Sequence, residues 1–108
     1  MEWFDVAERV DYFRKYAESL DGGEAKDGNW DDYSKQAVKL ECVVYPMVVS
    51  WYFVIPQKEQ FKDAVRFALK YVGNGVSVTA LAKRNGRFVC ETFLSEKNVD
   101  SVFEWKFD

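Results

Sequence analysis

The sequence of 108 residues contains no histidine. Histidine is the usual general base near neutral pH and the commonest metal ligand in proteins. Its absence excludes a Ser-His-Asp or Cys-His site within this chain, together with every zinc site built on histidine. The sequence also lacks a phosphate-binding glycine loop and a nucleophile-elbow motif. It therefore predicts a protein that is not an enzyme and that holds no cofactor and no metal.

Cysteine is scarce as well, because Cys42 and Cys90 are the only two and they form no CxxC pair. A secreted protein of this size would more often carry a disulfide framework, so two reduced thiols are expected. The N-terminal stretch MEWFDVAERV has acidic residues where a secretory signal needs a basic start and an apolar core. These features predict an intracellular, cytoplasmic protein.

A long membrane-spanning run is also missing. Residues 42–56, CVVYPMVVSWYFVIP, carry no charge but are shorter than the roughly 20 apolar residues that a membrane helix needs. They are rich in the β-branched and aromatic residues that favour strands. Because Pro46 cannot donate to a sheet ladder, we expect two strands, at 36–45 and 47–55, joined by a bend. Both strands are expected to form the centre of the core, and no membrane partner is predicted.

Two helices are expected around these strands. The first covers residues 3–20 and ends at Gly22-Gly23, and the second begins near Pro56 and ends at 73–75. Apolar residues recur on one face of each helix at the spacing of an amphipathic helix. These residues are Val6, Ala7, Val10, Phe13, Ala17 and Leu20 in the first, and Phe61, Ala64, Val65, Ala68, Tyr71 and Val72 in the second.

The C-terminal third predicts further strands. Asn85-Gly86 between two strand-like runs is a strong hairpin signal, and a short loop there places Ala82 opposite Val89 and Ala80 opposite Glu91. Alternating residues predict a last strand at 101–107. The chain should therefore be a single α+β domain over 1–108, of order α-β-β-α-β-β-β. Its mostly antiparallel sheet of four or five strands would have both main helices on one face.

The acidic residues are concentrated in the N-terminal part. Residues 1–41 contain 11 acids and 6 bases, whereas the remainder is slightly basic. Within 21–32 they flank a tryptophan, and such a cluster would attract a basic protein partner, with the tryptophan as its anchor. A solvated loop with the tryptophan in the core is the alternative. The candidate partner-binding residues are Asp21, Glu24, Asp27, Trp30, Asp31 and Asp32.

Calcium is a further interpretation of this segment, because Asp27, Asn29 and Asp31 alternate in DGNWDD. An EF-hand loop needs glycine at its sixth position and glutamate at its twelfth. Here those positions hold Asp32 and Val38. The pattern is a poor match, and no calcium site is predicted.

A basic stripe provides a second candidate surface, because four bases recur every fourth residue along the second helix and the hairpin tip adds three more. Nucleic-acid binding is one interpretation, and the solvated side of a helix is the other. The low isoelectric point, about 5.0, favours the second interpretation, so a nucleic-acid partner is not expected. The residues are Lys58, Lys62, Arg66, Lys70, Lys83, Arg84 and Arg87.

A ligand-binding or catalytic domain remains an alternative. The hairpin register puts Glu91 among apolar neighbours, where a carboxylate can gain a raised pKa and act as a base. Exposure of Glu91 at an edge of the sheet is the other interpretation, and the one that the mixed opposite face of the hairpin favours. The predicted element order and the stretch DGNWDDY resemble the cone-shaped NTF2-like fold and its turn after the first helix. That resemblance implies an apolar pocket between sheet and helices. Many sites in that family use a His-Asp pair, which this chain cannot supply.

Size, acidity and the missing catalytic residues together favour a small protein that binds another protein. Immunity proteins that neutralise basic toxins and phage-encoded inhibitors of host defence share these traits. We therefore expect an inhibitor that blocks a basic partner through the acidic loop at 21–32. The NTF2-like domain and a nucleic-acid accessory protein are the alternatives, and no oligomeric state is predicted.

Overall fold

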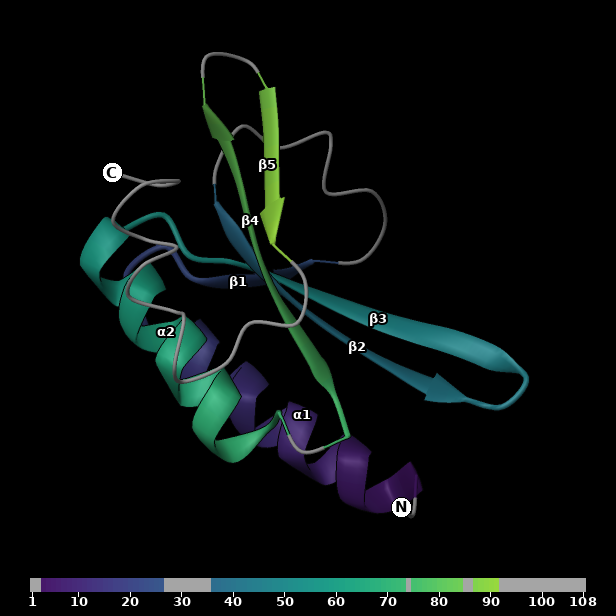
Figure 1. Ribbon diagram of the computed structural model, residues 1–108. Coiled ribbons are helices and arrows are strands. Elements are labelled where there is room, and N and C mark those ends of the chain that lie inside the picture. The colour runs from purple at the N-terminus through teal and green to yellow at the C-terminus, as the bar shows by residue number, and fades with distance from the viewer. Residues whose placement is uncertain (1–2, 27–35, 74, 85–86, 92–108) are drawn as a thin grey trace.

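The computed structural model describes residues 3–26, 36–73, 75–84 and 87–91 (Figure 1). Their elements are α1 (Trp3–Glu18), β1 (Glu24–Lys26), β2 (Ala37–Val44), β3 (Met47–Val54), α2 (Lys58–Tyr71), β4 (Ser77–Arg84) and β5 (Arg87–Glu91). The strands form one sheet in the order β1-β3-β2-β4-β5, and all neighbours are antiparallel. Both helices lie on one face of it. The predicted α+β class is confirmed, while the strand expected at 101–107 lies outside the described residues.

Strand β1 was not expected, because its residues fall inside the segment predicted to be a loop. Glu24–Lys26 pairs with the outer edge of β3 opposite residues 52–54. Three residues are too short to show an alternating pattern, and only the neighbouring strand makes them extended. The turn before β1 needs Gly22, whose φ is +73° and where a Cβ would lie 2.8 Å from the Cγ of Pro56.

The main core lies between the helices and the sheet. Val6, Val10, Phe13 and Ala17 of α1 are buried there, together with the inner face of α2 and alternate residues of β2, β3 and β4. Phe13 contacts Phe53 edge to face, with 5.0 Å between ring centroids. These aromatic side chains thus pack α1 against the sheet.

One residue of the predicted helix face is wrongly placed. Tyr71 of α2 is 51% exposed, although its spacing put it with the buried residues. It is the last residue of the helix, and its ring packs on Phe67 at 4.8 Å instead of entering the core. The tyrosine hydroxyl favours such a position, where one end of the side chain stays in water.

The sheet is buried on its second face too. Ala37, Val54 and Leu81 are at most 4% exposed and form a smaller cluster on the side away from the helices. Adjacent strands place them side by side, because Ala37 pairs with both Val54 and Leu81. The middle of the sheet is therefore covered from both sides, as a strand with consecutive apolar residues requires.

The predicted β4–β5 hairpin is confirmed in its register. Arg84 pairs with Arg87, Ala82 with Val89 and Ala80 with Glu91. The two residues between Arg84 and Arg87 are the Asn-Gly pair, as expected for a two-residue hairpin loop. Glu91 is thus at the register position of Ala80.

Candidate functional site: an exposed hairpin arm

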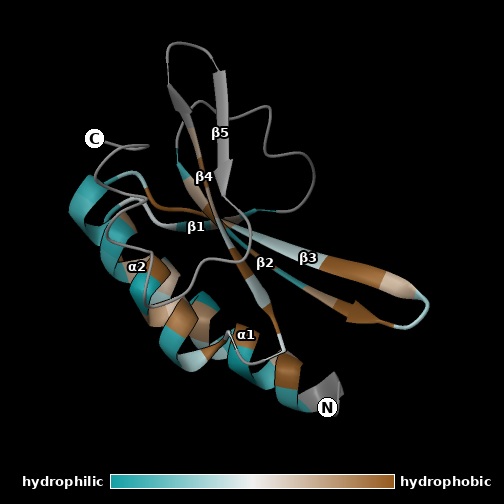
Figure 2. Cartoon of the chain, viewed as in Figure 1, coloured by the Kyte–Doolittle hydropathy of each residue, from teal (hydrophilic) through white to brown (hydrophobic). Residues whose placement is uncertain are grey.

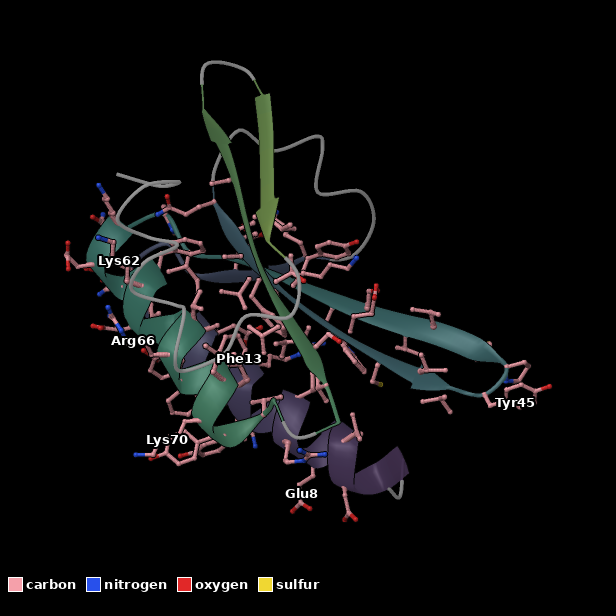
Figure 3. All side chains as sticks on the ribbon, in the orientation of Figure 1. Glu8, Phe13, Tyr45, Lys62, Arg66 and Lys70 are labelled. Carbon is pink, nitrogen blue, oxygen red and sulfur yellow. The ribbon has the colours of Figure 1, made fainter. Side chains whose placement is uncertain are left out.

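The distal half of the β2–β3 hairpin extends away from the rest of the domain (Figure 1). It comprises residues 42–44 of β2, the turn at Tyr45-Pro46 and residues 47–51 of β3, and is called the arm below. Figure 3 places Tyr45 at its far end, remote from both helices. Residues 37–41 and 52–54 of the same two strands form the inner half, which lies within the sheet.

The arm corrects the prediction that the apolar run is the centre of the core. Phe53, Val54 and Ile55 are buried as expected. The middle of the run is exposed instead, and Figure 2 shows hydrophobic colour along both strands of the arm. The exposed fractions are 71% for Val43, 92% for Tyr45, 61% for Met47 and 61% for Val48.

The edges of the arm are open within the described part of the chain. On one side, pairing of β2 with β4 ends at Glu41 and Ser77. On the other, pairing of β3 with β1 ends at Tyr52 and Lys26. The main-chain groups that point outward from residues 42–44 and 47–51 therefore have no strand partner among the described residues. Proteins usually protect such edges with charges, and this arm has none.

A polar cluster marks the point where the arm leaves the sheet. The Oε2 atom of Glu41 lies 2.9 Å from the Nζ of Lys39 and accepts a hydrogen bond of 2.9 Å from the hydroxyl of Ser50. The hydrogen bond and charge of Lys39 lower the pKa of Glu41, aided by Ser50 and opposed by partial burial. The two charges that precede the arm on β2 are thus paired with each other.

Cys42 does not provide reactive chemistry at the base of the arm. Its side chain is buried in the main core, and burial raises the pKa of its thiol. The charge of Arg9 opposes this effect but is the smaller influence. A thiol with a raised pKa is largely protonated and a poor nucleophile, so this cysteine acts as an apolar core residue.

The predicted acidic surface is only partly described. Asp21 and Glu24 are exposed in the turn and strand after α1, and Glu24 forms an ion pair of 2.7 Å with Lys26. Asp27, Trp30, Asp31 and Asp32, together with the DGNWDD pattern, lie outside the described residues. The structure thus brings two of the six predicted partner-binding residues to one surface, and the other four remain predictions.

The predicted basic stripe forms along α2. Lys58, Arg66 and Lys70 are exposed, and Lys62 is half-buried. Figure 3 shows Lys62, Arg66 and Lys70 along the outer side of the helix. Arg66 forms a 3.4 Å ion pair with Asp63, and Lys70 lies 5.3 Å from the ring centroid of Tyr71. Lys83, Arg84 and Arg87 belong to β4 and β5 by their backbone.

A row of aromatic side chains lies beside this stripe, between α1 and α2. Tyr16 stacks on Phe67 with 4.3 Å between ring centroids and 1° between ring planes, and Tyr12 stacks on Phe67 at 5.6 Å. These rings cover one another's faces. Single-stranded nucleic acid is bound by aromatic faces that are free to stack on bases. The row therefore gives little support to the nucleic-acid interpretation.

Comparison with known proteins returned no match, whether to family models, to curated proteins or to solved structures. The NTF2-like resemblance thus rests only on predicted element order and on residues 27–33, which lie outside the described residues. Neither of the two described helices is long and apolar enough to cross a membrane. The function of this chain must consequently be inferred from its own surfaces.

Sequence reasoning missed the arm residues, although a signal for them was present. The Tyr45-Pro46 pair in the middle of the run correctly indicated a turn. Residues near the end of a hairpin lie far from the sheet centre, and they stay exposed unless another element packs on them. Among the described elements, the reach of β1, β4 and the helices determines how far that cover extends, and none of these is readable from the run.

Proposed function

We propose that this chain acts by binding another protein and that the arm is its principal binding surface. The observation that supports this is the group of exposed apolar side chains at Val43, Tyr45, Met47 and Val48. Contiguous exposed apolar residues on a small domain are typical of an interaction site. Burying them against a partner would recover the hydrophobic free energy that the free chain forgoes.

The acidic segment is proposed as a second contact that guides a basic partner to the arm. Exposed charges such as Asp21 mainly change the association rate, and their effect falls as salt rises. Apolar contacts at the arm mainly determine the dissociation rate and depend little on salt. An inhibitor or immunity protein, as the sequence suggests, would need both fast association and slow dissociation.

The role of the arm can be tested by exposing the immobilised chain to a lysate of the native source. Tyr45→Ser with Met47→Ser removes exposed apolar surface from the arm. The matched control, Tyr12→Ser with Tyr71→Ser, removes similarly exposed aromatic surface from the helical layer, where these tyrosines are 59% and 51% exposed. Mass spectrometry should find specific proteins retained by the parent and the control but lost by the arm variant.

Salt separates the two contacts in the same experiment. Proteins held by the arm should remain bound at raised ionic strength, whereas an effect of the acidic segment should appear only at low salt. Equal retention by the arm variant and the parent would show that the arm is not the binding surface. Retention that occurs only at low salt would instead identify the acidic segment as the main binding surface.

A further inference from the structure

We propose that the arm binds a second copy of this chain, by antiparallel pairing of the outer edges of the two β3 strands at residues 47–51. This inference rests on the proposed function, because it names an occupant for the arm. Among the residues that the structure describes, the open edge of β3 is five residues long, against three residues for the open edge of β2. A longer edge forms more main-chain hydrogen bonds, so β3 is the stronger site for strand addition.

The charge pattern favours a second copy over an arbitrary partner. Residues 42–57 contain no charged side chain, and Lys39 and Glu41, which precede them on β2, are paired with each other. Lys26, which lies opposite Tyr52 where the open edge begins, is paired with Glu24. A partner edge that carried charges would have to place them against this apolar surface without counter-charges, which costs free energy. A second copy presents an uncharged edge of the same length by necessity.

The faces of the strand also match under two-fold symmetry. An antiparallel pair over the full open edge centres on Val49, which then lies opposite Val49 of the second copy. Met47 falls beside Trp51 of the second copy, and both lie on the helix side of the sheet, as their alternation with Val48 shows. Such an interface is isologous, because each surface meets itself.

The match would cover residues that the free chain leaves exposed. Met47 is 61% exposed, while Trp51 is half-buried and packs against the core. A methionine sulfur beside an aromatic ring is a favourable contact. On the other side of the sheet, Val48 would lie beside Ser50 of the second copy, a small side chain that leaves room for it.

Sedimentation equilibrium of the full chain tests this dimer with a matched pair of variants. Val48→Lys puts a charge on the edge strand, and Tyr12→Lys puts the same charge on α1, away from the arm, at a residue that is similarly exposed (59% against 61%). The parent and Tyr12→Lys should be dimers, and Val48→Lys should be a monomer. A monomeric parent, or a stronger effect of Tyr12→Lys, would overturn the proposal.

Cross-linking checks the register and does not depend on the folding of the lysine variants. In a chain with Cys42→Ala and Cys90→Ala, Val49→Cys should form a disulfide dimer on mild oxidation, because opposed residues at a two-fold lie within disulfide reach. Met47→Cys should not, since its symmetry mate is four residues further along. Equal cross-linking of both, or of neither, would contradict this pairing.

The two proposals fail in distinguishable ways. A parent that is monomeric but loses its captured proteins on Tyr45→Ser with Met47→Ser would refute the dimer and leave the binding function intact. A dimeric parent that retains no other protein would support the dimer, and would restrict the binding function to self-association.

Discussion

The inner and distal halves of the β2–β3 hairpin are both rich in apolar residues but differ in environment. At the inner half Phe53 is fully buried, with β1 beside β3 and the helices beneath it. At the distal half Met47, on the same strand and the same face, is 61% exposed. An apolar run thus identifies residues that need cover, but it does not show which element provides that cover. No described element packs on the exposed residues at the end of the arm.

The largest effect is expected from truncating the two same-face residues of β3. Phe53→Ala should lower the free energy of unfolding by about 3–5 kcal/mol, because it leaves a cavity against Phe13. Met47→Ala should change it by less than about 0.5 kcal/mol, as for other exposed positions. Urea unfolding of the monomeric Val48→Lys background, followed by far-ultraviolet circular dichroism, measures both. Similar costs for the two changes would mean that the arm belongs to the core.

A medium effect is expected from two adjacent residues of β2 that point to opposite faces. Cys42→Ser should cost about 1–3 kcal/mol, because its hydroxyl would be buried where the thiol is 6% exposed. Val43→Ser should cost under about 0.5 kcal/mol, since Val43 is 71% exposed. Thermal unfolding of both variants provides the comparison. A larger cost for Val43→Ser would contradict the assignment of Cys42 to the buried face of β2 and of Val43 to the exposed face.

The smallest effect concerns the junction of the two halves at Glu41. Its pKa in the folded chain lies below the ordinary value of 4.5. Stabilisation by the carboxylate is therefore fully present above pH 4.5 and is lost as the pH falls through the lowered pKa. Glu41→Gln should remove this part of the acid sensitivity and leave Lys39 without its partner. Urea unfolding of parent and variant across this acidic range should show the two curves converge at low pH, and parallel curves would contradict the role of Lys39.

Local sequence signals predicted most of the framework. The spacing of Phe13 and Phe61 identified the inner faces of both helices, and the Asn85-Gly86 pair identified the hairpin register of Ala80 with Glu91. These signals work because helix period, strand alternation and turn chemistry depend on neighbours in sequence. The candidate acidic and basic residues could be identified too, since charge is a property of the sequence alone.

The residues around 42–56 are sufficient to predict two strands joined by a turn at Pro46, since β-branched side chains and a missing amide act locally. Which part of those strands belongs to the core cannot be predicted from them, because burial depends on the reach of β1, β4 and the helices. β1 ends at Lys26 and β4 begins at Ser77, so their cover stops where the arm begins. Exposure of Tyr45 and Met47 follows from those two ends, which are distant from the arm in sequence.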